Sequence, residues 1–268
     1  MSKKNKSNIN TNTNVYRILA VVLSLLLIVG IVIFYKVGNY YSISDRTDNV
    51  KKYIKKDKYP ILGWVKVQGT NIDYPVMYSN DNSFNIYDES IDFGFAWRNF
   101  YDQDDSTWKV LVGHNIRNVS SKPLINQKEF NNFENLPSFL YYDFVKENKY
   151  IQYSDSNKNY LYKIYSIYMD DGENINNNEI LTKKEKKEKL EKTIEKSYFK
   201  FDVDVNENDK IISLTTCTRF GDVTSKGLVV NARMVRKNEK INNYSVTKKK
   251  NYNEIEKIMK GDEENEKA

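Results

Sequence analysis

Residues 211–217 read Ile-Ile-Ser-Leu-Thr-Thr-Cys, a run of apolar and β-branched residues that ends on the chain's one cysteine. Such a run predicts a β-strand, and the polar residues after it place Cys217 at a strand tip that faces a loop. The one histidine, His114, has a similar setting, because it follows the apolar run 110–113. A single cysteine forms no internal disulfide, and one cysteine with one histidine cannot complete a zinc site. Together they can supply a thiolate nucleophile and an acid–base partner.

Strand signals on both sides of this run predict a mainly β domain. Alternating apolar residues at 61–67 and 72–78 flank the turn-forming segment Gln-Gly-Thr-Asn, and Pro75 in the second run predicts an edge position or a bulge. Several short strands with few helices between them indicate a mostly antiparallel or mixed β-barrel and not a doubly wound α/β sheet. Further strands are predicted at 108–113, 150–154, 160–168 and 228–235.

Two helices accompany the strands. Residues 43–54 have the spacing of a short amphipathic helix with a serine or aspartate as its N-cap. Residues 182–196 are strongly charged, and Thr182 stands three residues before Glu185, which is the pattern of a capping box. We therefore predict one surface helix inserted before the cysteine strand.

The N-terminal segment 18–34 is apolar, carries no charge, and is flanked by tyrosines, so it reaches the length that crosses a bilayer. Three lysines among the first six residues, together with Arg17, place the N-terminus in the cytoplasm by the positive-inside rule. A cleaved signal peptide is the alternative, but no small-x-small cleavage motif follows the run. We predict a cytoplasmic tail at 1–14, a single-pass transmembrane anchor at 15–36 and an extracellular domain at 37–236.

Charge and composition narrow the possible partners. The 268 residues carry a net charge of +6, yet no basic stripe alternates with aromatic residues, so nucleic-acid binding is not expected. Residues 237–268 are charged and poor in core-forming residues. They predict a charged C-terminal tail with a short helix near 255–259.

Several short motifs resemble those of one enzyme family. Leu-Thr-Thr-Cys at 214–217 and the Gly-His-Asn centred on His114 resemble the strand ends of the sortases, the cysteine transpeptidases of Gram-positive cell surfaces. Residues 63–76 and 79–84 are similar to the opening strand pair of class B sortases and the segment that follows it. The charged helix at 182–196 is similar to the helix that class B inserts before its cysteine strand.

This resemblance, which spans residues 43–236, implies an eight-stranded sortase β-barrel with its active site at one rim. Cys217 would attack the threonine carbonyl of a C-terminal sorting signal and form an acyl-thioester. His114 would protonate the departing amine and then deprotonate the incoming amine of peptidoglycan or of a pilin. The reaction needs no metal or organic cofactor. The implied partners are surface proteins with a sorting signal, a peptidoglycan amine and the cell membrane.

One position departs from the family's pattern. Sortases carry an arginine eight to ten residues after the cysteine, where it binds the substrate and its oxyanion, and here those positions hold Ser225, Lys226 and Gly227. Lys226 is one candidate for the charge, although an ammonium does not reproduce the guanidinium fork. Arg219, in the same predicted loop, is the other. Thr215 is a further candidate for contact with the sorting peptide.

Two other interpretations stay open. Another cell-wall cysteine enzyme, such as an L,D-transpeptidase, also orders histidine before cysteine, but the Ser-His-Gly-Cys cluster that this family carries is missing from the sequence. The second is a degenerate sortase barrel that binds or assembles other proteins without catalysis. The missing arginine favours this second interpretation, and trapping of a thioester would separate it from the enzyme.

Overall fold

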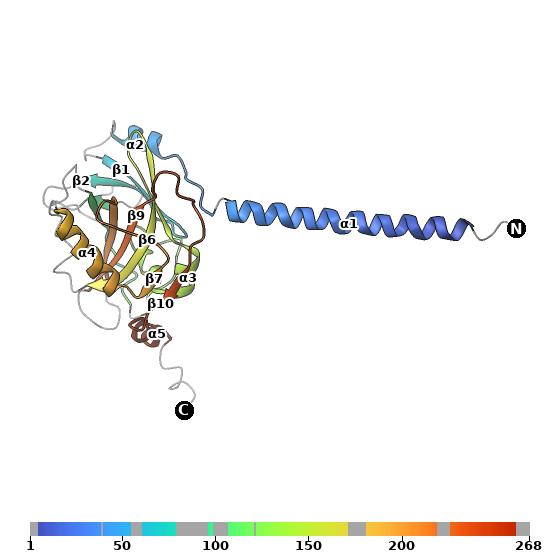
Figure 1. The fold of residues 1–268 in the computed structure, drawn as a ribbon. Helices are drawn as coiled ribbons and strands as arrows, with labels where there is room; N and C mark the ends of the chain where they lie inside the picture. Colours follow the sequence, from blue (N-terminus) through green and yellow to red (C-terminus); the bar gives the residue numbers. More distant parts are fainter. Residues whose placement is uncertain are drawn as a thin grey trace, which may run out of the picture. The chain divides into compact units, whose positions relative to one another are not determined.

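The computed structural model describes residues 5–38, 40–54, 61–78, 96–98, 107–120, 122–170, 181–218 and 226–260. These residues form two compact units (Figure 1). The first contains the N-terminal helix α1, and the second begins at Ile43 and contains the β-strands. The site discussed below lies within the second unit.

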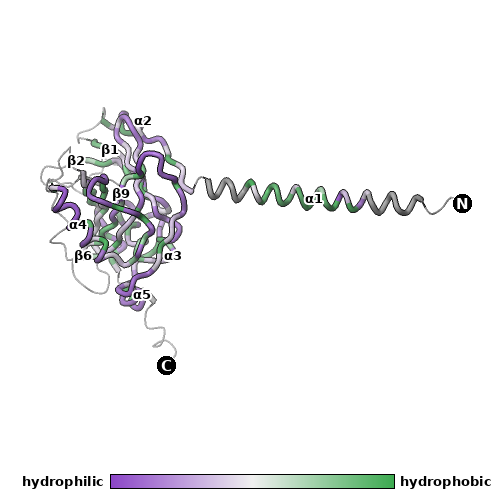
Figure 2. The backbone as a smooth tube through the Cα atoms, viewed as in Figure 1, coloured by the Kyte–Doolittle hydropathy of each residue, from purple (hydrophilic) through white to green (hydrophobic). Residues whose placement is uncertain are grey.

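The helix α1 spans Asn5–Gly38. Its segment Thr13–Ile31 has a mean hydropathy of 2.3, and its side chains are exposed. Figure 2 shows most of this segment as hydrophobic. By length and composition it can cross a bilayer, and an N-terminal signal sequence would have the same properties.

Eight strands close into a barrel in the order β1-β2-β3-β4-β8-β9-β6-β5, which confirms the predicted fold class. Neighbouring strands are antiparallel except for the pairs β2–β3 and β4–β8, which are parallel. A parallel pair needs a long crossover connection. Between β4 and β8 this connection contains, among other elements, β5, β6 and α4. The strands are β1 Ile61–Val67, β2 Asp73–Tyr78, β3 Ala96–Arg98, β4 Trp108–Val112, β5 Tyr150–Ser154, β6 Asn159–Asp170, β8 Ile211–Thr218 and β9 Lys226–Met234.

The proline of β2 does not mark an edge strand. Strand β2 pairs with β1 on one side and β3 on the other, so the predicted edge position of Pro75 is wrong. Pairing with β3 starts only at Val76, so the residue that lacks an N–H stands just before that ladder begins. The register shift of this strand pair lies in β1, between Ile61 and Gly63, and Pro75 pairs in regular register with Trp64, so the bulge is not at the proline.

The helix α4 spans Lys183–Lys196, as the sequence predicts. It begins with the predicted capping box, in which Thr182 and Glu185 each accept a hydrogen bond from the other's backbone N–H. The helix α2 spans Thr47–Ile54, so it begins later than the predicted residue 43. Between β4 and β5 the described residues also form the helical segments η1 Leu136–Leu140 and α3 Tyr142–Glu147.

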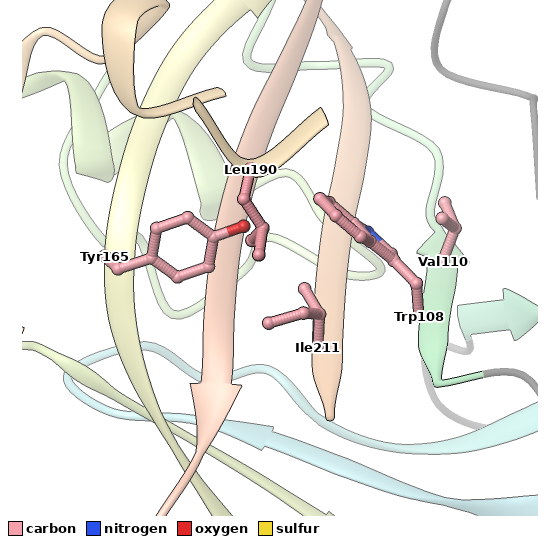
Figure 3. Packing of buried hydrophobic residues seen from close by; sticks show 5 residues of the cluster. All are labelled: Trp108, Val110, Tyr165, Leu190 and Ile211. Carbon is pink, nitrogen blue, oxygen red and sulfur yellow. The ribbon is translucent and has the colours of Figure 1, made fainter. Parts of the chain in front are cut away.

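Helix α4 packs on one face of the barrel. Leu190 of α4 lies with Tyr165 of β6, Trp108 and Val110 of β4 and Ile211 of β8 in one buried cluster (Figure 3). Ile211 begins the strand that leads to the predicted nucleophile. The helix that the sequence places before this strand therefore covers the same strands that carry the site.

The chain beyond β9 is not a tail, which corrects the prediction for residues 244–260. Strand β10 (Val246–Lys248) pairs with β7 (Phe199–Phe201), and α5 spans Tyr252–Lys260. The Tyr244 hydroxyl donates to the backbone carbonyls of Lys149 and Ile164 at 2.7 and 2.9 Å. The predicted short helix is present, but as part of a packed segment. The buried side chains of this segment are Tyr244, Val246, Tyr252 and Ile255.

Candidate active site

The parallel pairing of β4 with β8 brings two distant strand ends together. The register ends with Val112 opposite Thr215. Beyond it the Gly113 N–H donates to the Thr215 carbonyl at 3.1 Å, and the Thr216 hydroxyl donates to the Gly113 carbonyl at 2.6 Å. The two strand ends therefore stay hydrogen-bonded to each other up to the residues directly before His114 and Cys217.

His114 and Cys217 are the next residues after these paired segments, so they stand at the same level of two adjacent strand ends. The Cys217 side chain is exposed, whereas its strand neighbours Thr216 and Thr218 are buried. An exposed thiol at the end of an otherwise buried strand is accessible to a substrate. The sequence-based expectation that the two strand ends are neighbours is met.

Asn115 bridges the two strand ends. Its Nδ2 donates to the carbonyl of Cys217 at 3.0 Å and to the carbonyl of Asn118 at 2.9 Å. Its Oδ1 accepts from the Asn118 N–H at 3.1 Å. The side chain is buried, so a lost bond would leave a buried polar group unpaired. The turn after His114 is thus held against the backbone of Cys217.

The backbone around His114 is tightly packed. Its carbonyl accepts the Phe133 N–H at 3.1 Å, and the Phe133 ring lies so close to Gly113 that any side chain there would collide with it. Burial lowers the pKa of His114 below its ordinary value of 6.5. Neutral imidazole is therefore favoured near pH 7, and this is the form that accepts a proton from an amine.

A cavity lies on the barrel face that carries Cys217. Residues at alternate positions of a strand share a face, so Ser213, Thr215 and Cys217 lie on one side of β8. Ser213 and Thr215 line the cavity together with Asn231 of β9 and Lys189 of α4. Thr215, the candidate for substrate contact, thus lines this cavity and stands two residues from the exposed thiol on the same face of β8.

The sequence is similar to two curated sortases. Sortase B of Listeria monocytogenes is 24% identical over 191 residues, which cover 69% of this chain and 73% of that protein. Sortase B of Staphylococcus aureus is 24% identical over 195 residues, which cover 68% of this chain and 73% of that protein. No family model matches the sequence.

The fold is shared with solved sortase structures. The X-ray structure of Clostridium perfringens sortase B matches with a TM-score of 0.58 at 28% identity, over 70% of this chain and 99% of that one. In sequence and in fold this chain is similar to the class B sortases. A Staphylococcus aureus sortase B–substrate complex has the same fold, with a TM-score of 0.57, 23% identity and coverage of 71% and 86% of the two chains. So does a sortase B complexed with triglycine, with a TM-score of 0.57, 23% identity and coverage of 71% and 87%.

The similarity supports a sortase-type transpeptidase, and it makes the missing arginine the main question about the site. In the β8–β9 register, Cys217 stands opposite Gly227, and Lys226 stands opposite Thr218. The position directly opposite Cys217 is therefore a glycine, which offers no side chain. The backbone of Lys226 is in place one residue away, and Arg219 lies outside the described residues.

Among the described side chains of the barrel unit, arginines elsewhere in the chain do not replace it. Each already forms an ion pair with a carboxylate, and an arginine bound in this way is not available as an oxyanion ligand. Arg117 is the nearest to His114 in sequence, and its guanidinium also lies over the Phe130 ring. The pairs are Arg46–Asp73, Arg117–Glu134, Arg233–Glu239 and Arg236–Asp209.

The bridging role of Asn115 is the feature of the site that the sequence alone does not establish. The sequence places Asn115 beside His114 but does not show that its carboxamide reaches a residue 102 positions away. A polar residue directly after a predicted catalytic residue is the only local signal. The partner becomes visible only once the strand pairing is known.

Proposed function

We propose that this chain is a sortase B-like transpeptidase that cuts a C-terminal sorting signal after a threonine and transfers the surface protein to an amine. Cys217 is the nucleophile and His114 is the acid–base residue. The observation that carries the proposal is the joining of their strand ends by Asn115 beside an exposed thiol. The complexes of sortase B relatives with a substrate and with triglycine support a peptide donor and an amine acceptor.

The reaction divides into two acyl transfers. In the first, the Cys217 thiol gives its proton to His114 and its sulfur attacks the threonine carbonyl; the scissile C–N bond then breaks, and His114 passes this proton to the departing amine. In the second, an incoming amine attacks the thioester carbonyl and the C–S bond breaks. His114 takes the amine's proton and returns it to the Cys217 sulfur, so the enzyme is back in its starting state. The lowered pKa of His114 favours the base that this second step requires.

The tetrahedral intermediates of both steps carry an oxyanion. We propose Lys226 as the group that faces this charge and Arg219 as the alternative, with Thr215 in contact with the peptide. Lys226 is favoured because its backbone lies in β9, one residue pair from Cys217. Loss of one preorganised oxyanion donor lowers a rate by about 10²–10³-fold.

The acceptor and the location follow from the same proposal. The N-terminal segment anchors the enzyme in the cell membrane with its N-terminus in the cytoplasm, and residues 37–236 act outside the cell as the catalytic domain. The acceptor is an amine of peptidoglycan or of a pilin. The apolar segment Thr13–Ile31 and the lysines before it support this topology.

The test uses the full chain in detergent micelles and a library of peptides of the form Asn/Ser/Pro-Pro-x-Thr-Gly/Asn. Intact-protein mass spectrometry would detect an acyl adduct on Cys217, which we expect to be lost in Cys217→Ala. His114→Ala should slow both acylation and transfer to an added amine. Lys226→Ala and Arg219→Ala then identify the oxyanion ligand. Lys200→Ala, an exposed lysine of the separate β7–β10 sheet, is the matched control for loss of charge.

The result that contradicts the proposal is specific. If no peptide in the library acylates Cys217 and small thiol reagents also leave it unmodified, the chain is a sortase barrel without catalysis. An adduct that persists in Cys217→Ala would place the nucleophile elsewhere.

A further inference from the structure

The loop that follows His114 exposes three aliphatic side chains. Ile116, Leu124 and Ile125 are 45, 54 and 44% exposed, and we call these three the aliphatic surface. A single exposed aliphatic residue is ordinary in a folded protein. Three of them on one short loop, the first only two residues after a candidate catalytic histidine, indicate a surface that contacts a partner.

A buried amide holds the two parts of this loop together. The Asn118 Oδ1 accepts the Leu124 N–H at 2.7 Å, and its Nδ2 donates to the Leu124 carbonyl at 2.9 Å. The backbone of Asn118 is bound in turn to Asn115, whose side chain reaches the carbonyl of Cys217. The backbone of Leu124 is therefore fixed beside the turn that carries Ile116. The aliphatic surface is part of the same hydrogen-bonded unit as the candidate catalytic residues.

The charges around the aliphatic surface suit the surface of a bilayer. Lys122 and Lys128 stand on either side of residues 124–125 in the sequence, and both are exposed. Exposed Glu129 offsets one of them, so a small positive excess remains. Aliphatic side chains that enter the acyl region, with lysines at the level of the phosphates, are the pattern of a protein surface that lies on a membrane. Two further charges of the loop form the ion pair Arg117–Glu134.

The chain keeps the barrel within a short distance of any bilayer that α1 crosses. The helix α1 ends at Gly38. Six residues later the Ser44 N–H donates to Gln152 Oε1 at 2.9 Å, and the Ser44 hydroxyl accepts from Lys66 Nζ at 2.7 Å. Six residues of extended chain span at most about 20 Å. The barrel is therefore bound to a tether that is too short to let it move far from the membrane.

This point of attachment lies near the loop. Lys66, which binds Ser44, is the last residue but one of β1. The turn after β1 contains Asn71, whose Nδ2 donates to the carbonyls of Gln127 and Lys128 at 3.3 and 3.2 Å. The tether and the loop with the aliphatic surface are thus joined through one short turn, at the same end of β1.

We propose that the aliphatic surface docks on the membrane, with Ile116, Leu124 and Ile125 inserted at the boundary between lipid headgroups and acyl chains. This rests on the membrane anchor of the proposed function, because the anchor brings the barrel to the bilayer. It adds a lipid surface as a partner of the same site and holds His114 and Cys217 close to it. A second copy of the chain is a poorer occupant, because three side chains offer far less than the about 800 Å² per partner that a specific protein interface buries.

The test places single nitroxide labels on the full chain in vesicles of phosphatidylcholine and phosphatidylglycerol. Cys217 is the one cysteine, so Cys217→Ala provides a background in which Leu124→Cys, Ile125→Cys or Asn157→Cys carries the label. Asn157 is the matched control, because it is exposed in the turn after β5, and β5 runs antiparallel to β1, away from the turn that contains Asn71.

The depth of each label follows from its accessibility to oxygen, which concentrates among the acyl chains, relative to a water-soluble nickel chelate. We expect the labels at 124 and 125 to lie about 5–10 Å below the phosphates and the label at 157 to lie in water. All three positions are exposed, so the labels do not disturb the core.

The outcomes separate this proposal from the one on which it rests. If alkaline carbonate washes the full chain off the vesicles, the membrane anchor is wrong and the docking falls with it. If the chain stays but the labels at 124 and 125 are as accessible to nickel as the label at 157, the anchor stands and the docking is wrong. If the spectrum of the label at 124 sharpens when labelled chain is diluted with unlabelled chain, the aliphatic surface is a contact between copies and the lipid is overturned. Acylation of Cys217 is not measured, so a failure of the proposed chemistry leaves these results unchanged.

Discussion

The two ends of the β8–β9 pair are built in opposite ways. At one end Ile211 stands opposite Arg233, whose guanidinium is 3% exposed and bonds to Glu239 at 2.5 and 2.7 Å. Lys163 of β6 joins the same carboxylate at 2.8 Å. Buried charges are tolerated here because each has a partner. This end of the pair is closed by ionic contacts.

At the other end Cys217 stands opposite Gly227, and the thiol is exposed. One strand pair thus combines an end whose buried charges are all partnered with an end that leaves a thiol accessible. A rigid support at one end helps the other to hold the thiol in place.

Removal of the thiol should have the greatest effect on activity and a small effect on folding. For Cys217→Ala we expect the acylation rate to fall by at least about a thousandfold, because the nucleophile is lost. The free energy of unfolding should change by no more than about 0.5 kcal/mol, because the side chain is exposed. Mass spectrometry and thermal unfolding measure the two. A large loss of stability would mean that the Cys217 side chain also supports the fold.

At the end of the strand pair that contains Arg233, we expect a large effect on stability and a small effect on activity. Glu239→Gln should destabilise the fold by about 2 kcal/mol, because the buried cations Arg233 and Lys163 lose their charged partner. The kcat/KM of acylation should stay within about twofold, because the change is distant from Cys217. Chemical denaturation of the full chain measures the first effect.

The same variant has a signature in pH. Burial alone would raise the pKa of Glu239, but hydrogen bonds from Arg233 and Lys163 outweigh it and lower the pKa from 4.5 to about 2. A carboxyl with a lowered pKa contributes stability that is complete above 4.5 and is lost as the pH falls through about 2. The advantage of wild type over Glu239→Gln should shrink across this window. A constant difference would contradict the ionic explanation.

Asn115→Ala should lower both the stability of the fold and the rate of acylation to an intermediate degree. It leaves the carbonyl of Cys217 and the N–H of Asn118 without their partner, at a cost of about 1–3 kcal/mol. We expect kcat for acylation to fall about tenfold as the two strand ends lose alignment. Asn115→Asp keeps the acceptor for Asn118 but loses the donor to Cys217. If Asp restores kcat as well as stability, the bond to Cys217 does not position the site.

The smallest effect concerns the titration of His114. The chain has one histidine, so a single imidazole Cε1–H resonance in the NMR spectrum reports its protonation. Burial should place the midpoint below 6.5. The neutral ring then contributes stability above pH 6.5 that is lost as the pH falls through the lower midpoint. A midpoint above 6.5 would mean that a negative partner, such as the Cys217 thiolate, outweighs burial.

Local patterns predict part of this structure well. The apolar runs of β1, β4, β6 and β8 and the capping box of α4 are visible in adjacent residues, so the strand tips of His114 and Cys217 could be predicted. The strand β3, only Ala96–Arg98, is too short to leave a periodic signal. The packing of segment 244–260 escapes prediction because its buried residues are separated by charged ones, so no run of apolar residues marks it as core.

The order of amino acids alone specifies the chemistry that is available: one thiol and one imidazole, each at the end of a strand, behind an apolar N-terminal segment. Which groups act on each other is set by the folded barrel. Asn115 reaches the backbone of Cys217, and Ser213 forms a hydrogen bond with Asn231, because β4, β8 and β9 lie side by side. The physical reason is that local patterns report backbone shape and burial, whereas hydrogen bonds between distant residues depend on which strands pair and in which register.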